Sequence, residues 1–142
     1  YEETEKCGCG NTGCLEQYAS ATGIVKLAEK RLKQDHVDSV LREKPVSAKV
    51  VFDALKAGDA VAAEIVEEFG RYLGHGLANL AVVTDPSVIV IGGGVSNAGD
   101  ILLDYVKKYF QEKAFFANKN TAFILATLGN SAGICGAAKL IL

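Results

Sequence analysis

Methionine, basic clusters, long apolar runs and an export signal are all missing from this sequence. The formal net charge is −2 and no basic cluster is present, so electrostatics give no support for nucleic-acid binding. No apolar run is long enough to cross a bilayer. The chain starts with Tyr-Glu-Glu-Thr-Glu, which is acidic and polar, whereas an export signal starts positive and continues apolar. We therefore expect a cytoplasmic protein with neither a membrane nor a nucleic-acid partner.

Because translation begins with methionine, the lack of this residue leads us to expect a piece of a longer protein. The 142 residues, with an apolar fraction of 49%, are sufficient for one domain with a real core. No internal repeat or low-complexity tract is visible. We nevertheless expect the piece to be unstable without the part of the protein that precedes it.

Cysteine is scarce but concentrated, since three of the four cysteines lie in the run Cys-Gly-Cys-Gly-Asn-Thr-Gly-Cys over residues 7–14. Thiolates at this spacing, with glycines that let the backbone wrap tightly, can converge on a cation such as zinc. A disulfide or a reduced buried cluster is the alternative, but Cys7 and Cys9 are too close for an unstrained bridge. A reducing compartment also favours metal. We predict that Cys7, Cys9 and Cys14 bind zinc.

Structural zinc takes four ligands, and this run supplies three. Within the chain the candidates for the fourth ligand are His36, His75 and Cys135, and sequence spacing favours none of them. A ligand from before Tyr1 is the other candidate. For His75, the simpler interpretation is a packed or surface-facing helix residue.

Apolar residues recur every three or four positions in the first part of the chain, which predicts helices. A helical pattern begins at Leu15, directly after the cysteines. Ser47 is suited to cap a short helix over residues 48–57, which Gly58 would end. The longest pattern predicts a helix over residues 59–83.

Three glycines, Gly70, Gly74 and Gly76, interrupt this longest helix. Each lowers helix propensity by about 1 kcal/mol relative to alanine. Their presence therefore suggests that another backbone approaches the helix closely.

Two short apolar runs rich in β-branched residues, over 87–91 and 122–126, predict strands buried on both faces. Between them an amphipathic helix is predicted over residues 101–113, with Asn97 and Asp100 as a capping pair. Strand, helix and strand form a βαβ unit, so the strands should be parallel neighbours. Because two parallel strands make a poor sheet, we expect the rest of the sheet to lie upstream.

Gly92, Gly93 and Gly94 follow the first strand, at the edge where open α/β sheets place their ligands. Glycines there permit close contact between the backbone and a base, a ribose or a phosphate. The run lacks the last glycine of a dinucleotide fingerprint, and no Gly-Lys-Ser/Thr follows for a P-loop. A tight strand-to-helix turn is an equally good interpretation of these glycines alone.

Glu16 follows the last clustered cysteine by two residues, so a metal loop would fix its carboxylate as a hydrogen-bond acceptor. On spacing alone, an acid that complements the helix dipole is the simpler interpretation.

The pattern Cys-x-Cys-Gly-x-x-Gly-Cys-x-Glu over residues 7–16, followed by Tyr-Ala-Ser-Ala-Thr-Gly over 18–23, resembles the signature of the ROK family. This family contains bacterial sugar kinases and sugar-responsive repressors. The run over residues 6–23 is most similar to the ROK glucokinases, and the chain matches only the C-terminal half of such kinases.

Two later segments carry the same resemblance. Residues 91–96 resemble the adenosine-binding segment of ROK kinases. Residues 128–138 resemble the family's closing segment, where many members have an aspartate in place of Ser131. A last helix is predicted over residues 131–141, and Cys135 within it is most simply a small packed residue.

The resemblance implies the fold, an α/β architecture that forms the C-terminal part of an actin-like, ribonuclease H-like ATPase domain. It should be helix-rich, with a parallel βαβ unit. The implied regions are a zinc loop (1–14), a helical region (15–84) and a βαβα nucleotide-side region (87–142). The N-terminal domain would be absent from this chain.

The resemblance also implies ATP-dependent phosphorylation of a hexose, most simply glucose to glucose 6-phosphate, as in glycolysis. Glu16 would bind the sugar and Gly92, Gly93 and Gly94 the nucleotide, with magnesium accompanying ATP and with zinc in a structural role. In ROK kinases the catalytic aspartate, the phosphate loop and the zinc-binding histidine belong to the N-terminal half. No catalytic residue is therefore assigned here, and the piece alone is expected to be inactive. Family members are commonly homodimers.

Two rival functions stay open. A sugar-responsive ROK repressor would keep the cysteine loop and the sugar site, but it need not keep the intact Gly-Gly-Gly run. A zinc-stabilised interaction module would bind neither sugar nor nucleotide.

Overall fold

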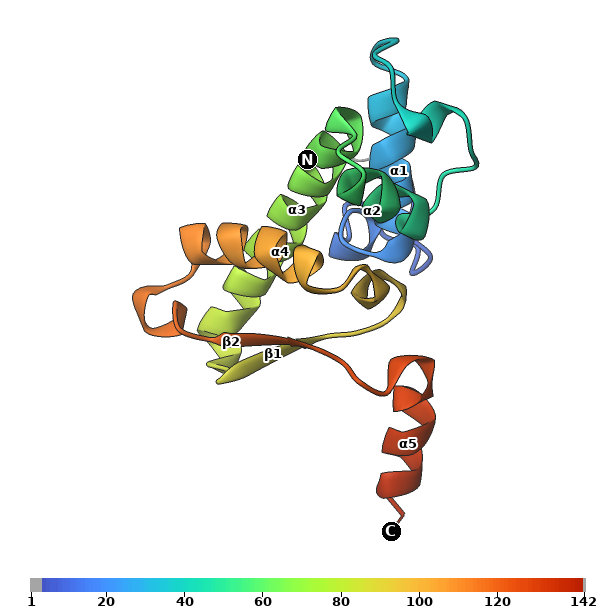
Figure 1. The fold of residues 1–142 in the computed structure, drawn as a ribbon. Helices are drawn as coiled ribbons and strands as arrows, with labels where there is room; N and C mark the ends of the chain where they lie inside the picture. The colour runs from blue at the N-terminus through green and yellow to red at the C-terminus, as the bar shows by residue number, and fades with distance from the viewer. Residues whose placement is uncertain (1–3, 142) are drawn as a thin grey trace.

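Helix α3 (Ala60–Thr84) is the element around which the computed structural model of the protein is built. The structure describes residues 4–141, and α1, α2 and α4 all pack against α3 (Figure 1). With η marking a short 3-10 helix, the remaining elements are η1 (Leu15–Gln17), α1 (Ala21–Leu32), η2 (Val40–Arg42), α2 (Ala48–Lys56), β1 (Val88–Ile91), η3 (Gly94–Ala98), α4 (Asp100–Lys113), η4 (Phe116–Asn118), β2 (Ala122–Leu125), η5 (Gly129–Ser131) and α5 (Ala132–Lys139).

The crossing of α3 and α4 depends on the glycines in α3. A Cβ atom added to Gly74 would lie 2.7 Å from the carbonyl oxygen of Val106 and 2.8 Å from the amide nitrogen of Phe110. A Cβ at Gly70 would lie 2.9 Å from the Cβ of Tyr105. These distances leave no room for a side chain, so the predicted close approach of another backbone is confirmed for Gly70 and Gly74. It is wrong for Gly76, where the side chain of Leu15 is the neighbour.

Polar side chains set the starts of two helices. Asp59 caps α3 by accepting from the N–H of Ala62, and Ser47 caps α2 as predicted. The predicted capping pair of α4 is wrong: Gly99 occupies the N-cap position with φ of +83°, and no side chain accepts a cap hydrogen bond there. Asp100 instead is the first residue of the helix.

Strands β1 and β2 are parallel neighbours, paired from Val88 with Ala122 to Ile91 with Leu125. The predicted βαβ unit is therefore confirmed. Helix α4 covers one face of the sheet (Figure 1). On that face the rings of Phe110 and Phe123 meet edge to face, with centroids 4.9 Å apart.

The prediction that both strands are buried on both faces is wrong for the described residues. On the face away from α4, the exposed fractions are 41% for Val88, 55% for Val90 and 48% for Ile124. Residues 4–141 place helices against one face only, so the apolar side chains on the other face stay accessible.

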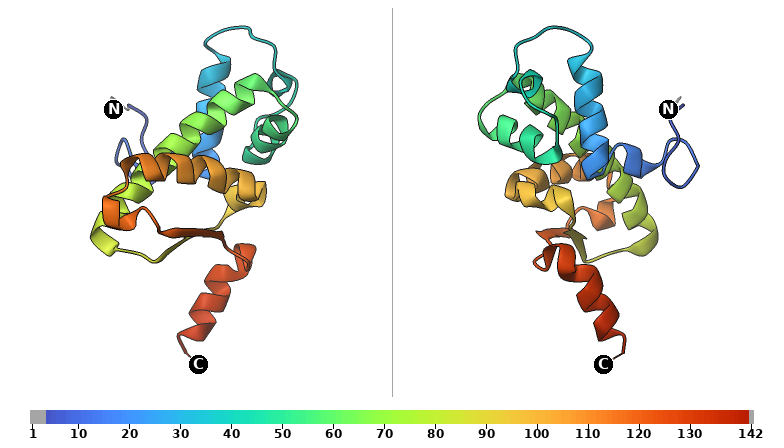
Figure 2. Two further views of the ribbon diagram at one scale, coloured as in Figure 1. Left: turned by 60° about the vertical axis from the view of Figure 1, so that its left-hand side comes forward. Right: turned by 90° about the vertical axis from the view of Figure 1, so that its right-hand side faces the viewer.

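Helix α5 extends away from the other helices and carries the C-terminal end of the chain (Figures 1 and 2). Every described residue of this helix is exposed, including Cys135. The prediction of Cys135 as a small packed residue is therefore wrong for this structure. None of the helices in the described part of the chain combines the length and apolar character needed to span a membrane.

Candidate metal centre and carboxylate site

The cysteine loop, residues 7–14, closes on itself through backbone hydrogen bonds. The N–H of Cys7 donates to the carbonyl of Asn11 at 2.7 Å, and the N–H of Gly10 donates to the carbonyl of Cys7 at 2.8 Å. Gly10 and Gly13 have φ of +89° and +69°, a left-handed conformation that favours glycine. The tight wrap that the sequence predicted is thus achieved by two of the three glycines in the loop.

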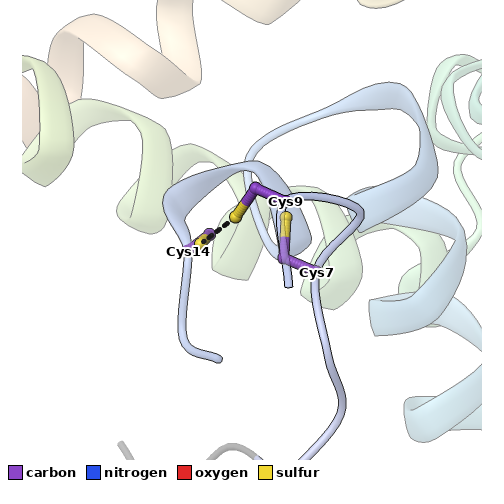
Figure 3. A group of neighbouring side chains, drawn as sticks. All are labelled: Cys7, Cys9 and Cys14. Atoms are coloured by element: carbon purple, nitrogen blue, oxygen red, sulfur yellow. Dashed lines mark hydrogen bonds between the residues drawn. The ribbon is translucent and has the colours of Figure 1, made fainter. Parts of the chain in front are cut away.

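The three clustered sulfur atoms point toward one another (Figure 3). The sulfurs of Cys7, Cys9 and Cys14 all lie within 4.8 Å of one another, and those of Cys9 and Cys14 are 3.5 Å apart. Zinc binds thiolates at about 2.3 Å in a tetrahedron, which separates two sulfurs by about 3.8 Å. The arrangement fits a zinc-sized ion with small adjustments, and soft sulfur donors suit zinc chemically.

Neither histidine belongs to this converging group, and nor does Cys135. Among residues 4–141, the only such group of histidine, cysteine or acidic side chains is the cysteine triad. His75 packs edge to face against Tyr109, with its Nε2 atom 4.0 Å from a carboxylate oxygen of Glu112. This placement agrees with the simpler interpretation of His75 as a packed helix residue.

The contact between Cys9 and Cys14 shifts the pKa values of these two thiols in opposite directions. A backbone hydrogen bond from Asn11, followed by the contact with Cys14, lowers the pKa of Cys9. The same contact raises the pKa of Cys14 to about 11. Metal binding to all three sulfurs would therefore have to displace protons, as is usual for thiolate sites.

Gln17 is a residue that sequence reasoning missed. Its side chain is buried, accepts from the N–H of Cys14 at 3.2 Å and donates to the carbonyl of Glu5 at 2.9 Å. It thereby links the end of the cysteine loop, at Cys14, to the segment that precedes the loop, at Glu5. A glutamine three residues after the start of a turn is the pattern of a capping box, and this signal could have identified it.

Glu16 lies in the 3-10 turn η1 and not, as predicted, in the first turn of a long helix. Its carboxylate is exposed and has three possible donors around it. The thiol of Cys7 donates to Oε2 at 3.3 Å and the hydroxyl of Thr22 donates to Oε1 at 3.0 Å, while the hydroxyl of Ser20 lies 3.4 Å from Oε1. The contacts with Cys7 and then Thr22 lower the pKa of Glu16, so the carboxylate is charged at neutral pH.

Helix α1 begins only at Ala21, because Ser20 is its N-cap and the preceding chain turns sharply. A Cβ atom at Gly23 would lie 2.6 Å from the carbonyl carbon of Tyr18, so only glycine fits at this corner. This corner, the turn between η1 and α1 where Gly23 packs on Tyr18, brings the start of α1 back toward η1. As a result, the first turn of α1 faces the carboxylate of Glu16.

The glycine turn after β1 has the predicted position at the carboxyl end of the strand. Gly93 has φ of +75°, which favours glycine, and a Cβ at Gly94 would lie 3.5 Å from the Cβ of Ala21. The turn therefore lies beside the first turn of α1, the same turn that contacts Glu16. The structure thus brings the predicted sugar-side and nucleotide-side residues to neighbouring positions.

Comparison with known sequences gives a family match over the whole chain. The sequence profile of the ROK family matches residues 1–142. A glucokinase from Halalkalibacterium halodurans is 45% identical over 95% of this chain and 42% of its own length. The DNA-binding transcriptional repressor Mlc of Escherichia coli is 31% identical over 96% of this chain and 34% of its own length.

A solved structure agrees with the sequence matches. The crystal structure of a ROK family glucokinase from Streptomyces griseus, in complex with glucose and AMPPNP, superposes with a TM-score of 0.84 at 35% identity. The match covers 99% of this chain and 48% of that protein. The chain thus spans less than half the length of these relatives, and the predicted helix-rich α/β fold of a ROK sugar kinase is confirmed.

Proposed function

The chain belongs to the ROK family, and on that premise we propose that the whole protein transfers the γ-phosphate of ATP to a hexose, most simply the 6-hydroxyl of glucose. The glucokinases among its relatives support this choice, as does the fold shared with a glucokinase that binds glucose and AMPPNP. Magnesium would accompany ATP, as in other phosphoryl transfers.

The observation that carries the proposal is the placement of Glu16. Its carboxylate is charged and exposed, and the hydroxyl of Thr22 donates to its Oε1 atom. A carboxylate has about four acceptor positions, so it can accept from sugar hydroxyls while the contact with Thr22 remains. Hydrogen bonds to a charged acceptor are stronger than neutral ones, which suits recognition of a polyhydroxylated substrate.

Cys7, Cys9 and Cys14 would hold zinc as a structural ion that fixes the loop next to Glu16. When bound, zinc supplies a crosslink between the two ends of the loop and takes no part in the phosphoryl transfer. The protein would provide the fourth ligand outside residues 4–141, where the family resemblance implies a histidine.

Gly92, Gly93 and Gly94 would lie against the nucleotide. The turn lies at the carboxyl end of β1, where parallel sheets place ligands, and it carries no side chains that would obstruct a base or ribose. The catalytic aspartate and the phosphate loop would come from the rest of the protein, so this chain contributes binding residues and no catalytic base. We also propose the homodimer that is common in the family.

A coupled assay of the full-length protein tests this function by following ADP formation with ATP and a panel of hexoses. We expect ADP formation with glucose and none with 6-deoxyglucose, which lacks the accepting hydroxyl but keeps the other contacts. If no hexose in the panel supports ADP formation, the proposed kinase activity is wrong.

A sugar-responsive repressor is the second candidate, because Mlc is among the relatives. The glycine turn favours the kinase, since a repressor has no need of a nucleotide site. Titration of the full-length protein with AMPPNP separates the two functions: saturable nucleotide binding supports the kinase, and its absence together with hexose-sensitive DNA binding supports the repressor. An interaction module would bind neither nucleotide nor sugar.

A further inference from the structure

A line of hydrogen bonds connects the start of helix α1 to the carboxylate of Glu16. The N–H of Gly23 donates to the hydroxyl oxygen of Ser20 at 3.0 Å. The hydroxyls of Ser20 and Thr22 are 2.8 Å apart, and the Thr22 hydroxyl donates to Oε1 of Glu16 at 3.0 Å. Three short contacts thus lead from the N-terminus of α1 to Glu16, the carboxylate that the family resemblance implies in sugar binding.

The contact lengths and the number of protons together give the direction of this line, because the hydroxyl of Thr22 lies closer to Oε1 of Glu16, at 3.0 Å, than the hydroxyl of Ser20, at 3.4 Å. Each hydroxyl has one proton to donate. If Thr22 donates its proton to Glu16, then Ser20 must donate to Thr22, and the oxygen of Ser20 accepts from Gly23. All the donors point toward the carboxylate, so each bond polarises the next and the positive end of the α1 dipole is directed at Glu16.

The other two contacts of the carboxylate are weaker candidates for holding it. The direct contact of Ser20 with Oε1 is 3.4 Å long, and Ser20 has already committed its proton to Thr22. The thiol of Cys7 donates at 3.3 Å, but a sulfur that binds zinc has lost its proton and cannot donate. Among residues 4–141, Thr22 is then the donor that remains for Glu16 when zinc is bound.

The backbone around Thr22 is held on both sides. On one side Gly23 packs against the carbonyl group of Tyr18 with no room for a side chain. On the other side Ala21 lies against Gly94 of the glycine turn. The hydroxyl of Thr22 therefore starts from a well-defined backbone position, although its side chain is exposed.

We propose that Thr22 is a positioning residue that orients the Glu16 carboxylate for hexose binding. This inference rests on the proposed function, because it assumes that Glu16 accepts from the sugar. Without the Thr22 hydroxyl, the carboxylate would rotate among several orientations, and binding the sugar would require it to be ordered again.

The test compares three variants of the full-length, zinc-loaded protein in the coupled assay. Thr22→Val removes the hydroxyl and keeps the shape of the side chain, whereas Thr22→Ser keeps the hydroxyl. Thr84→Val is the matched control, since Thr84 is also exposed and donates only to the carbonyl of Leu80 in its own helix, at 3.0 Å.

For Thr22→Val we expect the hexose KM to rise about tenfold, with kcat and the KM for ATP changing by less than about twofold. Thr22→Ser and Thr84→Val should stay within about twofold of the wild type in all three quantities. A role in stability alone would not produce this separation of hexose KM from kcat, or the rescue by serine. Should Thr22→Val not fold, the pair Thr22→Ala and Thr22→Ser gives the same contrast.

An unchanged hexose KM in the valine variant would overturn the positioning role while leaving the kinase proposal intact. So would an equal rise in the serine variant, because the hydroxyl would then be irrelevant. Failure of the proposed function is a different result, in which the wild-type protein phosphorylates no hexose.

Discussion

Helices α3 and α4 meet through a buried apolar contact, whereas the cysteine loop is an exposed turn held by polar contacts. At the helix crossing, Gly74 lets the backbones touch and Phe110 is fully buried. In the loop the order comes from backbone hydrogen bonds, two left-handed glycines and the buried amide of Gln17. The crossing is held by packing, whereas the loop brings three thiols together where a cation could bind.

This difference separates stability from binding. Changes at the crossing should lower the stability of the protein, because they disturb close packing. Changes in the loop should affect hexose binding with little effect on the helices, because Glu16 is attached to the loop and to the start of α1. Each of the following experiments tests one side of this separation.

The largest effect is expected for Gly74→Leu. Its side chain would have to displace the backbone of α4, which lies within 2.8 Å of the position of the new Cβ. We expect the free energy of unfolding to fall by about 3 kcal/mol, at the upper end for overpacked sites. Urea denaturation of the full-length variant, followed by circular dichroism, measures this loss.

Arg71→Leu is the matched control, since it places the same side chain on α3 at a position that is 48% exposed. Its ion pair with Glu68 is long, at 3.7 Å, so its loss should matter little. Equal destabilisation by the two leucine variants would show that the helix crossing is not the sensitive contact.

Removal of metal tests whether the cysteine loop affects hexose binding without affecting the stability of the helices. We expect a strong chelator to lower the affinity of the full-length protein for glucose by at least about tenfold, because the loop no longer holds Glu16 in place. Far-ultraviolet circular dichroism should show that the helices persist, and added zinc should restore the affinity. Complete loss of metal with unchanged glucose affinity would contradict a structural role for the loop at the sugar site.

A smaller effect on stability is expected at the start of α3. Burial raises the pKa of Asp59, but hydrogen bonds from Ala62, Ser39 and neighbouring backbone N–H groups together lower it below its ordinary value. A carboxyl with a lowered pKa stabilises the fold at pH values above its ordinary pKa and loses this contribution as the pH falls through the folded-state value. Asp59→Ala should therefore cost about 1 kcal/mol at neutral pH and progressively less in acid.

Urea denaturation at pH 7 and in acid measures this dependence, with Asp59→Asn as the control. Asparagine also caps helices well but has no charge to lose, so its stability relative to alanine should not vary with pH. A constant difference between wild type and Asp59→Ala across the pH range would show that the charge of Asp59 is unimportant.

Much of the helical core could be predicted from the sequence. The apolar period of about four residues predicted α3 to within one residue at each end. The glycines predicted the helix crossing, and the cysteine spacing predicted the convergence of the three sulfurs. In each case a local pattern carries the physical reason for the structure.

The errors arose where the structure depends on contacts that no local sequence pattern shows. The helix expected from Leu15 begins at Ala21, because Gly23 packs on the carbonyl of Tyr18 and leaves the preceding residues in a 3-10 turn. Burial of both sheet faces and of Cys135 was predicted from local apolar patterns, but no element within residues 4–141 covers these side chains. The line from Ser20 through Thr22 to Glu16 also escaped prediction, because it exists only after the corner at Gly23 has folded.

Titration of glucose into the full-length Glu16→Gln variant is the most direct test of the central claim that the cysteine loop and α1 present this carboxylate to a hexose. Glutamine keeps the size of the side chain but replaces one charged acceptor oxygen with a donor. We predict that calorimetry will show glucose affinity reduced by more than about tenfold, with AMPPNP affinity and zinc content as in the wild type. Wild-type glucose affinity in this variant would contradict the claim.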